Sequence, residues 1–265
     1  MVEPIERLDD PRVEAYAHVG DPAWLESHGL FVAEGRFVVR RLLEAGRFTT
    51  RSLFLTPAAY AALAQVVALD CVPVYVGSRP LLQALTGFDF HRGCLALADR
   101  GCSASAASLL GASLLVALEA VGNPDNVGGI FRNALAFAAG GVVLDPSSGD
   151  PLYRKAIRTS MGAALTVPFV RLGDWPGGLG QFRAAGFTII ALTPAPDAID
   201  IQAFAHSRPP GALMLLAGHE GHGLSQAAMA ASDVRCRIPI DPRSDSLNVA
   251  VATGIALALF RSRSS

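Results

Sequence analysis

The chain has 265 residues, and 51% of them are hydrophobic, so it can bury one large core or two smaller ones. Its formal net charge of −1 excludes a surface that attracts nucleic acid everywhere, but leaves room for local basic patches. The four cysteines form no CxxC pair, and the charged N-terminus lacks the apolar core of a signal peptide. Because no apolar run reaches the ~20 residues that cross a bilayer, we expect a cytoplasmic protein without a membrane span.

The N-terminal part of the chain predicts a lead-in, a small domain and a linker. Residues 1–28 carry three prolines and many charges, which is typical of a weakly patterned lead-in. From 29 to 100, short apolar strands alternate with helices, which predicts a small α/β domain. Its strands are expected at 31–33, 52–56, 72–76 and 94–98, and its helices at 36–45 and 81–85. The small, polar and Gly-rich stretch 101–112 predicts a linker.

Residues 113–265 predict a larger α/β domain. Its strands are expected at 114–118, 141–145, 167–171, 187–193, 212–217 and 234–240, and its helices at 127–139, 151–162, 177–185, 225–231 and 246–261. Near-continuous apolar strands separated by helices predict a mostly parallel sheet with helices on both faces. Since ligands bind at the carboxyl ends of such strands, the loops after Leu118, Ala217 and Ile240 are the candidate site.

The first of these loops leads into an apolar helix that carries Arg132. An Asn-Pro-Asp-Asn turn and the pair Gly128-Gly129 come before it, which indicates a loop with special backbone angles. Asn126 and Arg132 are therefore candidate site residues. By itself the stretch would also fit a capped helix with a surface arginine.

The second loop, 218–225, combines three glycines with Glu220 and a capping serine, Ser225. Such a loop can present backbone N–H groups to a ligand. His219 and His222 flank Glu220, but their spacing differs from the H-E-x-x-H that places two imidazoles one helical turn apart. We therefore expect two solvent-facing histidines and no metal.

The third segment, 238–252, joins a strand to the C-terminal apolar helix. Ser246 is the expected N-cap, and Asn248 is a polar residue in the first turn that needs partners if buried. The chain has no GxGxxG motif in the first βα turn, and its only lysine is Lys155, so neither a dinucleotide nor a Walker-type ATP site is indicated.

Together, the three segments resemble the three motifs of the SpoU (TrmH-like) branch of the SPOUT RNA methyltransferases. The matching stretches are 126–133, 216–225, and 238–240 with 246–252. The resemblance covers 113–265. Residues 30–98 more loosely resemble the L30e-like substrate-binding domain of many members, through 31–35 and 91–93.

The resemblance implies a C-terminal trefoil knot, a homodimer, and methyl transfer from S-adenosylmethionine to a ribose 2′-hydroxyl in RNA. The RNA would be rRNA or tRNA, with rRNA favoured because of the auxiliary domain. The backbone of four residues would hold the cofactor: Thr193, Gly218, Ile238 and Leu247. No metal would take part.

Arg132 is the family's catalytic arginine by position. Since a guanidinium pKa stays above ~12, we favour a role in holding phosphate and stabilising negative charge, with action as a base as the second possibility. The remaining catalytic positions would orient Arg132, shape the loops and contact the ribose: Asn126, Glu220, Ser246 and Asn248.

Two basic clusters are candidates for RNA contact, Arg36, Arg40 and Arg41 in one and Arg154 and Arg158 in the other. Either cluster could instead be a solvated face. Two other interpretations stay open. One is a catalytically silent RNA-binding protein that retains the fold, and the other is a nucleotide-dependent metabolic enzyme on a doubly wound sheet.

Overall fold

The computed structural model describes residues 2–66, 68–69, 71–87, 93–101, 104–207 and 211–261. The chain splits into two compact units. The first comprises Met1–Cys102 and Leu152–Thr166, and the second comprises Ser103–Pro151 and Val167–Ser265. His91 and Arg92, part of the L30e-like resemblance, lie outside the described residues.

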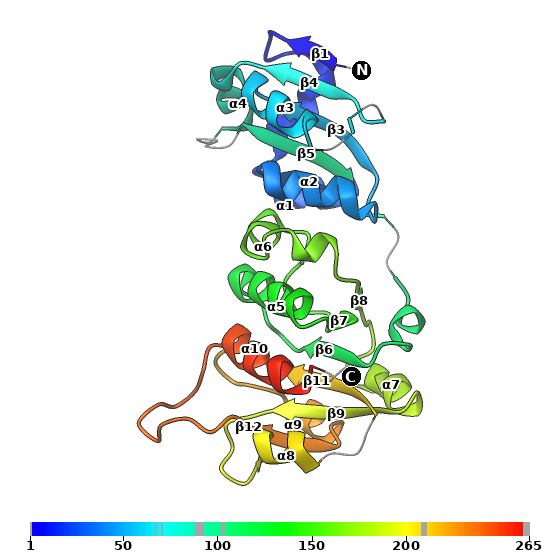
Figure 1. The fold of residues 1–265 in the computed structure, drawn as a ribbon, viewed down its shortest axis with the longest axis vertical. Coiled ribbons are helices and arrows are strands. Elements are labelled where there is room, and N and C mark those ends of the chain that lie inside the picture. The colour runs from blue at the N-terminus through cyan, green and yellow to red at the C-terminus, as the bar shows by residue number, and fades with distance from the viewer. Residues whose placement is uncertain are drawn as a thin grey trace. The chain divides into compact units, whose positions relative to one another are not determined.

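The first unit is built on a five-stranded mixed sheet (Figure 1). Its strands, in the order β1-β4-β3-β5-β2, are β1 (Val2–Ile5), β4 (Val74–Gly77), β3 (Thr50–Leu55), β5 (Cys94–Asp99) and β2 (Leu30–Glu34). Its helices are η1 (Pro11–His18), α1 (Pro22–Ser27), α2 (Arg36–Ala45), α3 (Pro57–Ala64), α4 (Arg79–Thr86), α6 (Arg154–Thr159) and η3 (Ala163–Leu165). The helix predicted at 36–45 is confirmed as α2, which ends at Gly46 in the left-handed conformation.

Residues 2–27, which the sequence suggested as a lead-in, form β1, η1 and α1 of the first unit. Val13, Tyr16 and Val19 are buried in its core, and the Tyr16 hydroxyl lies 2.9 Å from Ser52 Oγ. Their spacing of three residues suits a 3₁₀ helix, in which i and i+3 eclipse, and differs from the 3.6 spacing of an α-helix.

The segment 152–166 also differs from expectation, because it belongs to the first unit and not to the second. Arg41 Nη1 donates to the carbonyl of Met161 at 2.8 Å, and Arg154 lies 3.5 Å from Glu34 Oε2. Both basic clusters therefore lie in one unit.

The second unit contains a seven-stranded sheet in which every neighbouring pair is parallel. Its strands, in the order β10-β12-β9-β11-β6-β7-β8, are β10 (Ile199–Asp200), β12 (Val234–Arg237), β9 (Phe187–Leu192), β11 (Ala212–Ala217), β6 (Leu114–Leu118), β7 (Gly141–Leu144) and β8 (Phe169–Arg171). The predicted parallel sheet is confirmed. The short strand β10 was not predicted.

Helices cover both faces of this sheet, as predicted (Figure 1). Helices η2 (Ala106–Leu109), η4 (Gly177–Leu179), α7 (Gly180–Ala184) and α9 (Gln226–Ala230) pack on one face. Helices α5 (Pro124–Ala136), α8 (Ile201–Ser207) and α10 (Val249–Phe260) lie on the other. Helix η2 falls within the expected linker, and its Leu109 is buried in the core of the second unit. No described helix has the length and apolar character needed to cross a membrane.

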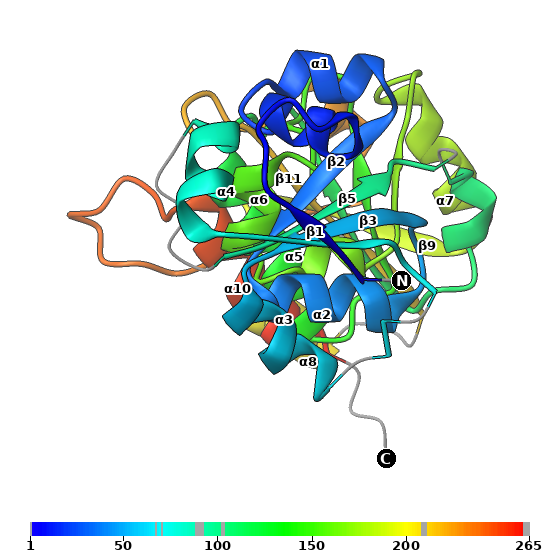
Figure 2. The ribbon, with the colours of Figure 1, turned by 90° about the horizontal axis from the view of Figure 1, so that it is seen from above.

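The strand order reverses between β6 and β11, which lie side by side at the centre of the sheet. On one side of this pair, β7 and β8 follow β6 toward one edge of the sheet. On the other side, β9, β12 and β10 follow β11 toward the opposite edge. The loops after β6 and β11 therefore begin at one point on the sheet edge, where ligands bind in such folds. The loop between β12 and α10 extends away from the sheet in both views (Figures 1 and 2).

Candidate active site

A cavity of about 310 Å³ lies at the carboxyl ends of β9, β11 and β12. The residues expected to hold a cofactor all line it: Thr193, Gly218, Ile238 and Leu247. Glu220 and Ser246 line it as well. Parts of the chain more than 50 residues apart thus meet around one space of a size typical for small ligands.

The glycine loop after β11 folds tightly on itself. The Gly223 N–H donates to the carbonyl of His219 at 3.0 Å, and Gly223 has a φ of +69°. A Cβ on Gly218 would lie 2.5 Å from the backbone carbon of Gly223 and 2.5 Å from Leu224 N. Only glycine fits at position 218 without moving the backbone.

One of the two histidines in this loop departs from expectation. His219 is half-buried and lines the cavity, whereas His222 is exposed. The rings stack at 4.1 Å, and His219 Nδ1 accepts from Gly221 N at 2.8 Å. His222 faces solvent as predicted, and His219 does so only in part, because its ring also stabilises the turn. Within the described ranges, no group of three or more His, Cys, Asp and Glu side chains could hold a metal ion.

Three polar side chains from the three motifs form one hydrogen-bonded chain. Asn126 Nδ2 donates to Glu220 Oε1 at 2.5 Å, and Asn248 Nδ2 donates to Asn126 Oδ1 at 2.8 Å. Asn126 is only 8% exposed, so both its amide atoms need these partners. The chain fixes the glycine loop to α5 and to the start of α10.

Asn248, not Ser246, is the N-cap of the last helix. Asn248 Oδ1 accepts from Ala250 N at 2.9 Å and from Val251 N at 3.2 Å. The prediction of Ser246 as the cap was wrong, since α10 begins at Val249, later than expected. Ser246 is exposed and lines the cavity.

The pair Gly128-Gly129 also has a different role from the predicted turn. Both glycines lie inside α5, which begins at Pro124 behind an Asn123 cap. A Cβ on Gly129 would lie 2.9 Å from Ala250 Cβ. The glycine permits close packing of α5 against α10, where Asn133 Nδ2 also donates to the carbonyl of Ala250 at 2.7 Å.

The electrostatics of the cavity select among possible ligands. Glu220 and Asp245 line it, and no lysine or arginine is among the described residues that do. Such a lining disfavours phosphate groups and favours a cation such as a sulfonium.

Cys236 also lines the cavity. Burial, and then the nearby Asp200 carboxylate, raise the pKa of its thiol to about 11. The thiol therefore stays protonated at neutral pH and is a poor nucleophile.

Comparison with known proteins agrees with this geometry. The SpoU rRNA methylase family matches residues 113–258. The chain belongs to this family. A protein of Mycobacterium tuberculosis named as an uncharacterised tRNA/rRNA methyltransferase is 40% identical over 257 residues, covering 94% of this chain and 88% of the relative.

Two further relatives carry more specific names. The 23S rRNA (guanosine-2′-O-)-methyltransferase RlmB of a Burkholderia species is 34% identical over 185 residues, covering 66% of this chain and 72% of the relative. The AdoMet-bound rRNA methyltransferase of Sinorhizobium meliloti superposes with a TM-score of 0.81 at 25% identity. That comparison covers 98% of this chain and 97% of the other. The predicted resemblance to the SpoU family is confirmed.

Arg132, which the sequence analysis expects to be catalytic, does not line the cavity of its own chain. It is exposed on α5, and among the described residues no hydrogen bond or ion pair holds its guanidinium. The structure therefore brings together every other expected catalytic and cofactor residue, but leaves Arg132 outside the group.

The five arginines expected at RNA all lie in the first unit but differ in their contacts. Arg41 and Arg154 are half-buried and make the contacts to Met161 and Glu34, and Arg40 pairs with Glu44 at 2.7 Å. Arg36 and Arg158 are exposed, and within the described chain neither has a hydrogen-bond or ion-pair partner.

Two carboxylates that the sequence analysis missed anchor the loops of this SpoU site. Glu119, 7% exposed, accepts from Trp175 Nε1 at 2.8 Å, Ser225 Oγ at 2.8 Å and Ser225 N at 2.7 Å. Asp145 accepts from Ala120 N at 3.0 Å, next to Glu119. Burial opposes the charge of Asp145, but hydrogen bonds from Ser147, Ser148 and the backbone outweigh it and lower its pKa. A charged residue directly after the apolar strand 114–118 was the signal for Glu119.

Replacing Glu119 by Gln should weaken cofactor binding although Glu119 does not line the cavity. The NH₂ group of Gln is a donor, so it would face the N–H of Ser225 or of Trp175 with no acceptor between them. The hydrogen bond that holds the end of the glycine loop at Ser225 would then be lost or weakened. We expect affinity for S-adenosylhomocysteine, measured by calorimetry, to fall about tenfold, the effect of one charge-assisted hydrogen bond. The exposed Glu14→Gln is the matched control. Unchanged affinity in Glu119→Gln would show that the anchor does not position the loop.

Proposed function

We propose that the protein transfers a methyl group from S-adenosylmethionine to the ribose 2′-hydroxyl of a nucleotide in structured RNA. Ribosomal RNA is favoured over tRNA because of the additional first unit, which resembles a substrate-binding domain. The observation that carries the proposal is that the second and third SpoU motifs line one cavity, and that hydrogen bonds of Asn126 join the first motif to both. No lysine or arginine is among the described residues that line this cavity. An RNA substrate of this kind supports a cytoplasmic location.

The cavity suits the cofactor through its backbone. Thr193 N donates to the carbonyl of Cys236 at 3.0 Å, and this bond joins the ends of β9 and β12. Gly218 lets the loop after β11 pack closely against the backbone of Gly223 and Leu224. In the proposed complex the backbone around Thr193, Gly218, Ile238 and Leu247 holds the adenosine, with Glu220 near the cationic end. When bound, the cofactor supplies a methyl group already activated on a sulfonium.

The protein's own contribution is position and charge. The chain Glu220–Asn126–Asn248 holds the three motifs in one geometry, as a reaction between two bound groups requires. Arg132 binds the phosphate next to the target ribose and stabilises the developing alkoxide. Since a guanidinium keeps its proton in proteins, a role for Arg132 as the base is the weaker alternative. Ser246 and Asn248 shape the ribose side of the cavity.

We further propose a homodimer in which Arg132 of one protomer serves the cavity of its partner. Arg132 is exposed on α5 and is not among the described residues that line the cavity of its own chain, and α5 packs on α10. Helix α10 also exposes the apolar Val251 and Ile255, at 51% and 37% of their surface. A second copy would cover them and complete the site.

The test is methyl transfer by the full chain to total RNA, with Arg132→Ala as the control. We expect label from S-adenosylmethionine to enter RNA as 2′-O-methylribose, which resists alkaline cleavage at that position. Equal incorporation by both proteins would overturn the role of Arg132. Absence of incorporation would favour the silent RNA-binding protein, and calorimetric binding of NAD or ATP would favour the metabolic enzyme.

A further inference from the structure

His219 closes the turn of the glycine loop with its ring as well as its backbone. Its Nδ1 atom lies 2.8 Å from the backbone nitrogen of Gly221 and 3.4 Å from that of His222, and both N–H groups donate to it. The carbonyl of His219 accepts from the Gly223 N–H at 3.0 Å. Three successive N–H groups of the turn thus converge on one residue.

These hydrogen bonds fix the tautomer of the His219 ring. A backbone N–H can only donate, so Nδ1 must offer a lone pair, and the proton of the neutral ring must lie on Nε2. A charged ring carries a proton on both nitrogens and has no lone pair left for Gly221. Protonation would therefore place a donor opposite the Gly221 N–H and break the turn.

The turn also holds Glu220 in place. Glu220 lies between His219 and Gly221 in the chain, and its Oε1 accepts from Asn126 Nδ2 at 2.5 Å. His219, Glu220 and Gly221 all line the candidate cofactor cavity. If the turn opens, this wall of the cavity changes shape, and the hydrogen bond between the first and second motifs is weakened.

The charged and titratable groups around His219 act on its protonation with opposite signs. The His222 ring stacks on it at 4.1 Å, so a charge on either ring disfavours a charge on the other. The carboxylates of Glu220, in the same loop, and Asp245, in the loop before α10, line the cavity and favour a charged ring. Cys236 of β12 lines it as a neutral thiol. Among these described groups, only the two histidines are of a type that titrates near neutral pH.

We propose that His219 is a positioning residue that supports cofactor binding only while its ring is neutral, which rests on the proposed function. The neutral ring closes the turn, the turn holds Glu220 against Asn126, and the closed loop forms one wall of the cavity. Because an imidazole takes up a proton as the pH falls, the affinity for the cofactor is complete above the titration range of the ring and is lost below it.

Asparagine is the matched replacement for His219. An Asn side chain that accepts from the backbone two residues on forms an Asx turn, and His219 Nδ1 takes the place of that oxygen here. His219→Asn therefore keeps the acceptor and removes the titration, whereas His219→Leu removes both. His222→Gln removes the second histidine of the loop but keeps its backbone N–H.

Calorimetric titration of the full chain with S-adenosylhomocysteine tests the inference. We expect wild type to bind about tenfold more weakly at pH ~5.5 than at pH ~7.5, the effect of one group that must lose its proton and titrates at ~6.5 in water. His222→Gln should show the same dependence. His219→Asn should bind like wild type at the higher pH and equally well at the lower. His219→Leu should bind about tenfold more weakly at both, by loss of a hydrogen bond within the cavity wall.

Three results would each overturn the inference: a flat profile for wild type, a wild-type profile in His219→Asn, or wild-type affinity in His219→Leu. The other histidines of the chain are present in His219→Asn, so they cannot cause a difference between this variant and wild type.

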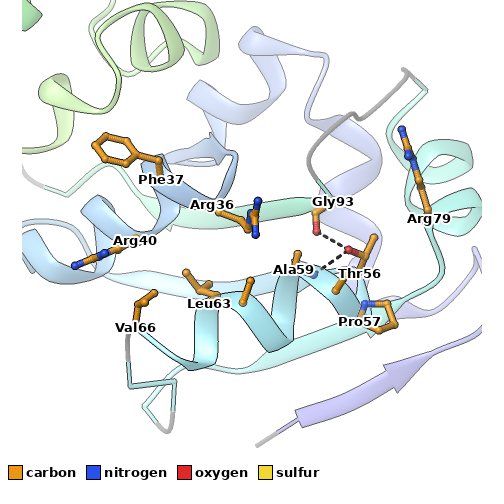
Figure 3. Close-up of a pocket in the computed structure, with 12 residues that line it drawn as sticks. Arg36, Phe37, Arg40, Thr56, Pro57, Ala59, Leu63, Val66, Arg79 and Gly93 are labelled. Carbon is orange, nitrogen blue, oxygen red and sulfur yellow. Dashed lines mark hydrogen bonds between the residues drawn. The ribbon is translucent and has the colours of Figure 1, made fainter.

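Methyl transfer to total RNA at low cofactor concentration should follow the same pH profile. Figure 3 shows a groove of about 870 Å³ in the first unit, which is lined by Arg36 and Arg40, two of the arginines expected at RNA, and by Arg79. No histidine or carboxylate is among its described lining residues, so these residues keep their charge over this range. A pH profile that differs between wild type and His219→Asn thus reports on the glycine loop.

Nitrogen NMR of the ligand-free chain separates this inference from the proposed function. At pH ~7.5 we expect the His219 ring to carry its proton on Nε2, and on acidification the Gly221 amide proton should move upfield as it loses its acceptor. A neutral ring with its proton on Nδ1 would overturn the inference whatever the ligand. The expected ring and amide signals, with no S-adenosylhomocysteine binding by any preparation, would overturn the proposed function and leave the pH-dependent turn standing.

Discussion

Replacement of Gly218 by Ala should lower the affinity for S-adenosylhomocysteine about 100-fold. The added Cβ would lie 2.5 Å from backbone atoms of Gly223 and Leu224, which no rotamer change can relieve. The loop would have to open, and the hydrogen bond between Asn126 and Glu220 would be lost. Strain of 1–3 kcal/mol plus one hydrogen bond gives about 3 kcal/mol, which corresponds to about 100-fold.

The matched variant is Gly221→Ala in the same loop. A Cβ there would lie 3.3 Å from the His219 ring, a side chain that can move, and Gly221 is not in the left-handed region. We expect only a few-fold loss of affinity by calorimetry and an unfolding temperature close to wild type for Gly221→Ala, whereas the strain in Gly218→Ala should also lower its unfolding temperature. Equal losses in the two variants would mean that cofactor binding depends on loop flexibility in general and not on the close approach at Gly218.

The sequence was sufficient to predict the parallel sheet and two of the segments that border the cavity. Apolar runs such as 114–118 and 212–217 need burial on both faces, so they indicate parallel strands whatever their order. Because β6 and β11 are neighbours, the segments that follow them begin side by side, and these segments carry the first and second motifs. The helix at 36–45 was predictable for a local reason, because Gly46 ends it.

Features that depend on contacts distant in sequence were not predictable. Ser246 and Asn248 are both good caps, and the bond from Asn248 to Asn126, 122 residues away, favours Asn248 in a way that the local sequence does not show. Gly129 looked like a turn glycine from its local sequence, because the residue that requires a glycine there, Ala250, lies on another helix. The segment 152–166 has a helical pattern, but no local signal shows which unit it joins.

The position of Arg132 leads to the other large effect. We expect Arg132→Ala to lower the turnover number at least ~100-fold, the usual effect of removing a group that stabilises developing charge. Because Arg132 does not line the cavity of its own chain, it should act across the proposed dimer. Two inactive chains should then complement each other: Arg132→Ala has an intact cavity, and Gly218→Ala has an intact arginine.

Coexpression of the two chains in equal amounts should restore about a quarter of wild-type methyl transfer at cofactor concentrations too low to load the Gly218→Ala cavity. Random assembly makes half of the dimers mixed, and each mixed dimer holds one site with both an intact cavity and the partner's intact arginine. If Arg132 served its own chain, each site would lack one component and activity would stay near zero. Differently tagged chains, purified through both tags, would contain only mixed dimers and should reach about half of wild type. Activity at the level of either single variant in that preparation would exclude action across the dimer.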